Sequence, residues 1–249
     1  MTASSTIERR KPRRRRDASA AAAGPTIALG YLPILRSDGS PAFREVFPAR
    51  QQCVRGSGLL AAVLDRLSAR PELRLSVDLT PADLEDMELL AALAHRLDER
   101  PETAERLILE VPEAAMMADP VRTRRRLARL RALGVAIAID GFASLQGSLR
   151  DLIGLRLDLI KIHPSFVRAI EINPDNRSFL GLVARIGEHA GIVTVCGGIE
   201  AVAEAEILTG LGIDLIQPRM RPTRPDAARA EIGPFASGAG DPLASAAFG

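Results

Sequence analysis

The sequence predicts an α/β protein built as a TIM-like (β/α) barrel, and three observations favour this fold class. The chain has 249 residues, of which 47% are hydrophobic and 26% are charged, so it can bury the core of a barrel domain. Short β-branched runs alternate with longer segments of helical periodicity, the pattern of parallel strands joined by helices. Such repeats follow one another through most of the chain, as a barrel requires.

Strands are expected where Leu, Ile and Val run together. The candidate ranges, in chain order, are residues 26–35, 73–79, 106–111, 135–140, 157–162, 192–196 and 213–217. Parallel neighbours need a crossover connection between them, and the intervals after residue 79 are long enough to hold a helix each.

Helix starts are marked by a capping side chain followed by proline. Thr80, Asp119 and Asn173 each precede a proline, the residue favoured at the first helical position. Apolar residues then recur at helical spacing and predict the faces turned to the core. These residues are Leu84, Met87, Leu90 and Leu93 in the first helix, Leu127, Leu130 and Leu133 in the second, and Phe179, Leu182, Val183 and Ile186 in the third.

The two ends of the chain differ in composition from its middle. Residues 1–24 are rich in Ser, Ala and Arg, and residues 231–249 are rich in Gly, Ala, Ser and Pro. We therefore expect a disordered Arg-rich arm, a barrel over residues 25–230 and a flexible C-terminal tail. No apolar run reaches the roughly 18 residues that cross a bilayer, which predicts a cytoplasmic protein.

Charge and cysteine content narrow the function classes. The formal net charge of +2 comes from the basic run near the N-terminus, so the barrel itself is not expected to bind nucleic acid. The run is either a solvated tail or a contact for an anionic membrane, RNA or an acidic partner. The cysteines, Cys53 and Cys196, have neither metal-ligand nor redox spacing.

Lysine is rare in this chain, since Lys11 and Lys161 are the only lysines among the 33 basic residues. An ammonium group can lose its proton when buried, which a guanidinium group does not do. A lysine inside the folded part is therefore a candidate base, with chance survival as the alternative.

Polar side chains stand at the ends of several predicted strands, where barrel enzymes carry their active sites. The residues are Asp78, Glu110, Asp140, Lys161 and Gln217. Each alone could cap the next helix, but together they predict a shared cluster at the barrel mouth. Clustered carboxylates repel one another unless a cation lies among them, and oxygen ligands favour Mg²⁺, Mn²⁺ or Ca²⁺ over zinc.

Such an ion would polarise a phosphoryl oxygen and lower the pKa of a bound water. Lys161 would either take the proton or balance the charge. The strand ends therefore predict phosphodiester hydrolysis.

Several segments, taken in order, resemble the EAL domain, the bacterial family of cyclic di-GMP phosphodiesterases and their inactive relatives. GVAIAIDGFA at residues 134–143 is similar to the family's LGVxxAIDDFG, and LIKIHPSFV at residues 159–167 is similar to FLKIDxSFV. LSVDLTP at residues 75–81, LEVPE at residues 109–113 and GIE at residues 198–200 resemble SVNLSP, LEITE and GVE. The likeness extends over residues 27–225 and implies an EAL-type barrel.

The resemblance also implies roles for single residues. The namesake motif falls at Glu45-Val46-Phe47. The family's metal ligands correspond to Glu45, Asp78, Glu110 and Asp140, which implies Mg or Mn as the cofactor. Lys161 takes the place of the lysine that helps to activate water, Gln217 that of an active-site glutamine, and Glu113 that of a glutamate supporting the catalytic loop.

The sequence departs from the family pattern at the second half of the metal site. Gly141 replaces the second aspartate of the DD pair, Gly197 replaces the acidic residue before GVE, and residues 143–146 read ASLQ in place of GTGY. Asp78 stands where the family has asparagine. These changes remove two carboxylates, so at most one metal ion is expected.

The residues that would hold the nucleotide depart from the pattern as well. Leu32 replaces the glutamine of YQPI, and Ala49 stands at the place of a phosphate-binding arginine. Arg50 lies one position late and could bind the phosphate in its place only if the loop shifts. His163 replaces an aspartate, in either a structural or a ligand-binding role. Binding of cyclic di-GMP is therefore expected to be weak.

We accordingly expect a degenerate EAL domain without catalytic activity. It would act in bacterial signalling by contacting an unidentified protein partner or by binding cyclic di-GMP weakly. The alternative is an active Mg/Mn-dependent phosphodiesterase that converts cyclic di-GMP to linear pGpG. The resemblance also allows a homodimer formed through the barrels.

Overall fold

The structure, a computed structural model, describes residues 27–49, 56–143 and 156–219. The predicted arm, the predicted tail, Arg50, Cys53 and residues 144–146 lie outside the described residues.

Within these residues, the strands form a closed barrel in which each strand pairs with its neighbours in the chain and β8 returns to β1. The strands are β1 (Leu29–Leu35), β2 (Pro41–Pro48), β3 (Leu75–Asp78), β4 (Leu107–Pro112), β5 (Ala136–Phe142), β6 (Leu159–Ile162), β7 (Val193–Ile199) and β8 (Leu215–Pro218). The predicted fold class, a TIM-like (β/α) barrel, is confirmed.

The barrel departs from a uniform parallel arrangement at β1, which is antiparallel to both β2 and β8. The sequence did not predict β2 as a strand, although it carries Glu45. A short turn connects β1 to β2, with Gly39 at a φ of 80° and the Asp38 carboxylate accepting a hydrogen bond from the Ser40 N–H. A connection this short can join only antiparallel strands, whereas the remaining pairs from β2 to β8 are parallel.

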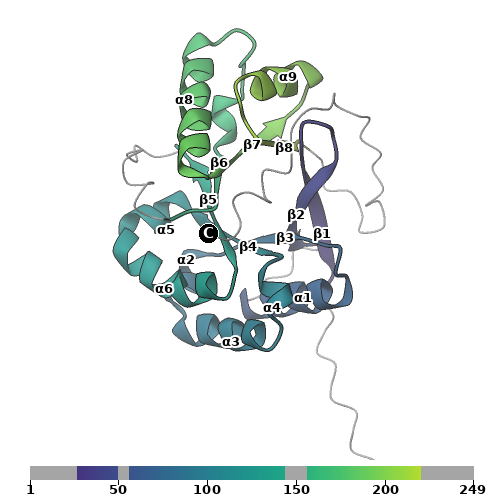
Figure 1. Cartoon of the computed structure of the whole chain (residues 1–249), viewed down its shortest axis with the longest axis vertical. Helices are drawn as coiled ribbons and strands as arrows, with labels where there is room; N and C mark the ends of the chain where they lie inside the picture. Colours follow the sequence, from purple (N-terminus) through teal and green to yellow (C-terminus); the bar gives the residue numbers. More distant parts are fainter. Residues whose placement is uncertain (1–26, 50–55, 144–155, 220–249) are drawn as a thin grey trace, which may run out of the picture.

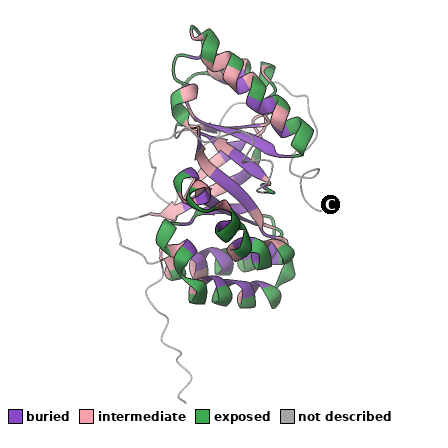
Figure 2. Cartoon of the chain, turned by 90° about the vertical axis from the view of Figure 1, so that its left-hand side faces the viewer, coloured by how far each residue is buried: buried purple, intermediate pink, exposed green. Residues whose placement is uncertain are grey.

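Helices surround the barrel in two groups, with α8 and α9 at one end of the view and α1, α3, α4 and α6 at the other (Figure 1). Their outer faces are exposed, while the strands between them are mostly buried (Figure 2). The helices are α1 (Gly56–Ala69), α2 (Pro81–Glu85), α3 (Met87–Asp98), α4 (Pro101–Ala104), α5 (Glu113–Ala118), α6 (Pro120–Ala132), α8 (Pro174–Ala190) and α9 (Val202–Gly210), with a short 3-10 helix η1 (Pro164–Phe166) after β6.

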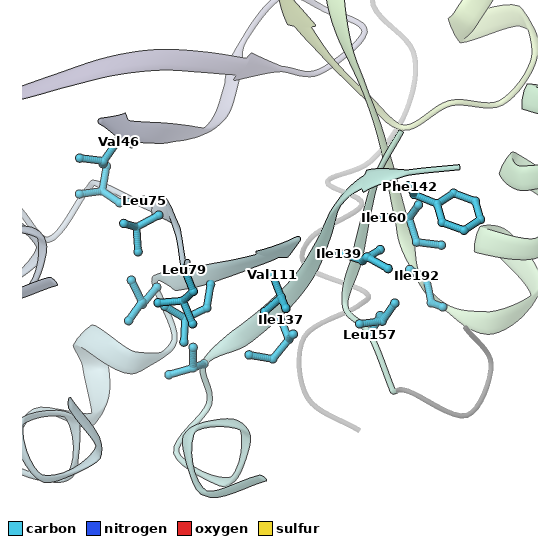
Figure 3. Close-up of a cluster of buried hydrophobic side chains, with 14 of the residues drawn as sticks. Val46, Leu75, Leu79, Val111, Ile137, Ile139, Phe142, Leu157, Ile160 and Ile192 are labelled. Atoms are coloured by element: carbon cyan, nitrogen blue, oxygen red, sulfur yellow. The ribbon is translucent and has the colours of Figure 1, made fainter. Parts of the chain in front are cut away.

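The buried apolar residues form two clusters. The larger cluster lies between the strands and the helices, and Figure 3 shows Leu79, Val111 and Ile137 among its members. The smaller cluster comes from strands alone and includes Phe43, Ile108 and Leu215, so it fills the barrel interior below the mouth. Alternate strand residues thus serve two layers, as in other barrels.

The predicted helix starts are confirmed, but the first helix is interrupted. Thr80 caps α2 in a capping box with Asp83. Asp86 then leaves the helical region, with φ −80° and ψ 92°, and its side chain caps α3 by accepting from the Leu89 N–H. The break rotates α3, so the prediction that Met87 faces the core is wrong, and Met87 is 55% exposed.

The predicted inner face of α8 is wrong at Leu182, which is 49% exposed, while Phe179 and Ile186 are only partly buried. The buried residues of α8 are Leu180, Val183, Ala184 and Gly187. A Cβ at Gly187 would lie 2.7 Å from the carbonyl oxygen of Ile192, so the helix backbone meets the start of β7 at this point. The face of α8 that carries Gly187 therefore lies against the barrel, and Leu182 lies on a different, exposed face.

No helix among the described residues is both long enough and apolar enough to cross a membrane.

Candidate active site

The mouth of the barrel brings together acidic side chains from three neighbouring strands. Asp78, the last residue of β3, pairs in register with Glu110 of β4, and Glu45 of β2 pairs with Ser76, two residues before Asp78. Because side chains two residues apart share a face, these carboxylates point into the same end of the barrel. The sequence places them far apart, and the closed barrel brings them together.

These three carboxylates have the geometry of a cation site. One oxygen from each of Glu45, Asp78 and Glu110 lies within 4.8 Å of the others. Oxygen ligands lie about 2.0 to 2.6 Å from Mg²⁺ or Ca²⁺, so atoms within this separation can share one ion. The residues therefore fit a single divalent cation. Asp140, the fourth predicted ligand, does not belong to this group of three within the described part of the chain.

Lys161 of β6 occupies the centre of the acidic cluster. Its Nζ donates to Glu45 Oε2 at 2.6 Å and to Glu110 Oε2 at 2.7 Å. Asp140 Oδ1 lies 3.8 Å from the same nitrogen. The Lys161 side chain is 13% exposed, so these contacts are largely shielded from water.

Gln217 of β8 also contacts the acidic cluster, although it lies far from Glu45 in the sequence. Its Nε2 lies 2.5 Å from Glu45 Oε2, the same oxygen that accepts from Lys161. Gln217 is 8% exposed. Glu45 is therefore fixed by two donors, one neutral and one charged.

Asp78 lies at the rim and is exposed as a residue, yet its carboxyl group lies in the crowded mouth. Desolvation, together with the charges of Glu110 and Glu45, raises the pKa of Asp78 to about 8, although Lys161 opposes the shift. In the metal-free protein this carboxyl group therefore holds a proton at neutral pH more readily than an ordinary aspartate.

The pKa shifts of Glu110 and Lys161 favour different charge states of the pair, a neutral carboxyl group and a charged ammonium group. Burial raises the pKa of Glu110, with Lys161 opposing. Burial alone would lower the pKa of Lys161, but Glu110, Glu45 and Asp140 outweigh it and raise that pKa. The hydrogen bonds from Nζ to two carboxylate oxygens favour the ion pair. Of the two predicted roles for Lys161, this arrangement favours charge balance over proton acceptance.

Glu113, the first residue of α5, is 2% exposed. Its Oε1 accepts a hydrogen bond from the Ala143 N–H at 3.2 Å. Ala143 has a φ of 68°, a strained value for a residue with a Cβ. Glu113 thus contacts the backbone directly after the end of β5.

Gly141 and Gly197, which the resemblance aligns with acidic residues of the family pattern, belong to the strands that carry the cluster or its neighbours. Gly141 has a φ of 70° and lies where the pairing of β5 with β6 shifts register. Gly197 of β7 pairs with Gln217, and a Cβ at Gly197 would lie 3.2 Å from Gln217 Oε1. The side chain of Gln217 therefore lies close to the space that a residue 197 side chain would need.

Among the described residues, those predicted to contact the nucleotide lie on different elements and do not form one cluster with the carboxylates. Leu32 of β1 pairs with Glu45 in register, while Ala49 closes the far end of the hairpin by donating its N–H to the Ala28 carbonyl. His163 caps η1, with its Nδ1 accepting from the Ser165 N–H. His163 thus has a local structural role here.

Sequence reasoning missed one residue of the mouth. Ser76 is completely buried on the same face of β3 as Asp78, and it pairs in register with Glu45. The two-residue period of a strand, counted back from Asp78, is the signal that could have found it.

Comparison with known proteins identifies the family of the chain. Residues 56–217 match the sequence profile of the EAL domain. The chain is 32% identical over 136 residues to the bifunctional diguanylate cyclase/cyclic di-GMP phosphodiesterase MucR of Pseudomonas aeruginosa, a match covering 55% of this chain and 19% of MucR. The chain thus spans about a fifth of the length of this curated relative.

Two solved structures share the fold. The PaMucR phosphodiesterase in complex with c-di-GMP has a TM-score of 0.70 and 23% identity, covering 81% of this chain and 94% of that one. The Klebsiella pneumoniae BlrP1 complex with manganese and cyclic di-GMP has a TM-score of 0.67 and 23% identity, covering 80% and 57%. At this identity the likeness establishes the fold alone. The profile match, however, covers more than half of the chain, and the chain therefore belongs to the EAL domain family.

Proposed function

We propose that this chain is an EAL domain that no longer hydrolyses cyclic di-GMP and instead acts as a regulatory module in bacterial signalling. It would do so by contacting a partner protein or by binding cyclic di-GMP weakly. The observation that carries this proposal is the presence of Gly141 and Gly197 where the family pattern has carboxylates. Neither position can supply a ligand to a second metal ion or a bridging water.

The remaining carboxylates support binding of a single ion at most. Glu45, Asp78 and Glu110 would hold it, and their oxygens suit Mg²⁺ or Mn²⁺. When bound, such an ion would polarise a phosphoryl oxygen and lower the pKa of a coordinated water. Loss of the second half of such a site lowers the rate by about several orders of magnitude.

Weak nucleotide binding is supported by the residues around the mouth. Leu32 offers an apolar side chain, where the family's glutamine could donate and accept hydrogen bonds. Ala49 offers no charge for a phosphate group. His163 is engaged with Ser165 in capping η1.

The experiment that tests the proposal combines turnover with binding. Purified protein would be incubated with cyclic di-GMP and Mn²⁺, with the products separated by chromatography and binding measured by calorimetry. We expect no linear pGpG above the level of the Lys161→Ala variant. Turnover that this substitution abolishes would overturn the proposal. Micromolar binding without turnover would define a receptor, and the absence of both would define a protein-interaction module.

A second candidate is an active phosphodiesterase with a single metal ion. The convergence of Glu45, Glu110, Lys161 and Gln217 within hydrogen-bonding distance favours it. Its signature would be Mn²⁺-dependent product formation that chelation stops and fresh Mn²⁺ restores.

A further inference from the structure

The centre of the acidic cluster already contains a positive charge from the chain itself. The Lys161 ammonium lies 2.6 Å from Glu45 Oε2 and 2.7 Å from Glu110 Oε2, two of the three residues whose oxygens could share a cation. Asp140 adds a third carboxylate at 3.8 Å. Lys161 therefore contacts two of the three carboxylate groups that a divalent ion would need.

Shielding from water makes this contact strong. The side chains of Lys161, Glu45 and Glu110 are 13%, 14% and 2% exposed. Removing one partner from an ion pair in such surroundings leaves the other charge uncompensated, which is strongly destabilising. The cluster of carboxylates thus depends on a cation for its stability.

The chain is otherwise poor in lysine, having two lysines and many arginines among its 33 basic residues. A compact ammonium group can place one point charge between several oxygens, whereas guanidinium is planar and spreads its donors in a fork. This difference fits a position where one nitrogen must lie between carboxylates from β2, β4 and β5.

We propose that Lys161 acts as the internal cation of the barrel mouth, occupying the place between Glu45 and Glu110 that a divalent ion would share. The carboxylate cluster is then held together by the chain alone. A metal ion competes with Lys161 for these oxygens. The competition with a metal ion rests on the proposed metal site. The effect of Lys161 on the stability of the fold does not depend on that site.

The stability arm compares the melting temperatures of chelator-treated variants. Lys161→Met keeps a side chain of similar length without charge, and Lys161→Arg keeps the charge. The matched control is Arg96→Met, which removes the exposed ion pair between Arg96 and Asp65 on the helical surface. We expect Lys161→Met to melt several degrees below wild type and below Arg96→Met, with Lys161→Arg in between. Equal melting temperatures for Lys161→Met and Arg96→Met would overturn the inference.

The competition arm measures Mn²⁺ binding by calorimetry and by the rise in melting temperature on adding Mn²⁺. Removing the resident positive charge should tighten Mn²⁺ binding of Lys161→Met by at least about tenfold relative to wild type. Equal binding would mean that Lys161 does not compete with the metal, and weaker binding would mean that Lys161 helps to bind it; either result would contradict the inference. If neither protein binds Mn²⁺, the proposed metal site fails, and the melting comparison alone decides the inference.

Chemical labelling measures whether Mn²⁺ displaces the Lys161 ammonium group. A purely structural role of Lys161 would leave its labelling rate unchanged by Mn²⁺. Lys161 and Lys11 are the only lysines, so an amine-reactive acylating reagent followed by mass spectrometry reports on each separately. We expect Lys161 to react slowly in chelated protein and faster in saturating Mn²⁺, with Lys11 unchanged. Slower labelling of Lys161 in Mn²⁺ would contradict the proposed competition between Lys161 and the ion for the carboxylates.

A double variant covers the case in which Lys161→Met does not fold. Lys161→Met combined with Glu110→Gln removes one positive and one negative charge from the same hydrogen bond. If Lys161 balances Glu110, the double variant melts above Lys161→Met. A double variant no more stable than Lys161→Met would contradict the inference.

Discussion

Gln217 of β8 donates a 2.5 Å hydrogen bond from Nε2 to Glu45 Oε2 of β2, across 172 residues of sequence. The two strands are not neighbours, since β1 lies between them in the barrel. The contact therefore spans the barrel mouth. The hydrogen bond fixes the orientation of the Glu45 carboxylate, which the pairing of the Glu45 backbone with β1 and β3 does not determine.

Gln217→Leu should lower the free energy of unfolding by about 1.5 to 3 kcal/mol, because a buried carboxylate loses a hydrogen bond from its amide donor. Urea denaturation followed by circular dichroism measures this change. Ser178→Ala is the control, since it removes a hydrogen bond from the exposed Ser178 hydroxyl to the Pro174 carbonyl. A Gln217→Leu protein as stable as the control would show that Glu45 needs no amide partner.

Asp78→Asn should change how stability depends on pH in the chelated protein. The folded-state pKa of Asp78 is raised to about 8 from an ordinary value of 3.8, so its ionisation opposes folding. The stability of the native chain then falls as pH rises from about 4 to about 8, whereas asparagine cannot ionise. The melting temperature of Asp78→Asn should therefore match wild type near pH 4 and exceed it at pH 8. Parallel melting curves across this range would refute the raised pKa.

Gly30→Ala should destabilise the β1–β2 hairpin, because a Cβ at Gly30 would lie 2.4 Å from the Phe47 ring. The ring must move, at a cost of about 1 to 3 kcal/mol. Phe47→Leu added to Gly30→Ala should recover much of this loss, since leucine lacks the ring atoms that would clash. Gly210→Ala is the control, because a Cβ there meets nothing within 4 Å. Thermal unfolding of wild type, the two single glycine variants and the double variant measures these changes. If Phe47→Leu does not raise the stability of Gly30→Ala, the clash is not with the Phe47 ring.

Gly141→Asp together with Gly197→Asp should raise Mn²⁺-dependent hydrolysis of cyclic di-GMP by at least about a hundredfold over wild type, by restoring ligands for a second ion. Aspartate tolerates the positive φ of 70° at Gly141 better than most residues. At Gly197 it requires Gln217 Oε1 to move, because the new Cβ would lie 3.2 Å away.

Adding Lys161→Ala to this double variant should remove the regained activity, because the family resemblance implies that Lys161 helps to activate the attacking water. Each aspartate alone should regain little, because two-metal chemistry needs both halves of the site. A correctly folded double variant that forms no product would contradict the proposal that the glycines at residues 141 and 197 are what prevents hydrolysis.

The parts of the site that sequence predicted best are those set by position along a strand. Asp78, Glu110 and Lys161 stand in predicted strands, and parallel strands deliver their ends to one mouth. Glu45 was predicted only from the family resemblance. Its strand, β2, was not predicted because it contains no run of β-branched residues. Its antiparallel pairing with β1 was not predicted.

What sequence could not give is the rotation of elements against one another. Leu182 has the spacing of a core residue, yet the close approach at Gly187 turns it outward. Likewise, nothing local indicates that Lys161 donates to both Glu45 and Glu110, since that contact depends on the diameter and closure of the barrel.

The pairing of β1 with β8 rests on a single register pair, Leu35 with Ile216. The strands that it joins lie at opposite ends of the barrel sequence, so the ring closes only through a contact of very long sequence separation. Such contacts form late in folding, because a large loop must be ordered before they are made. During synthesis, β2 to β7 can assemble in order as they emerge, but Glu45 meets Gln217 only after β8 has been made. Of the contacts at the mouth, the one between Gln217 and Glu45 therefore depends on the last strand of the barrel.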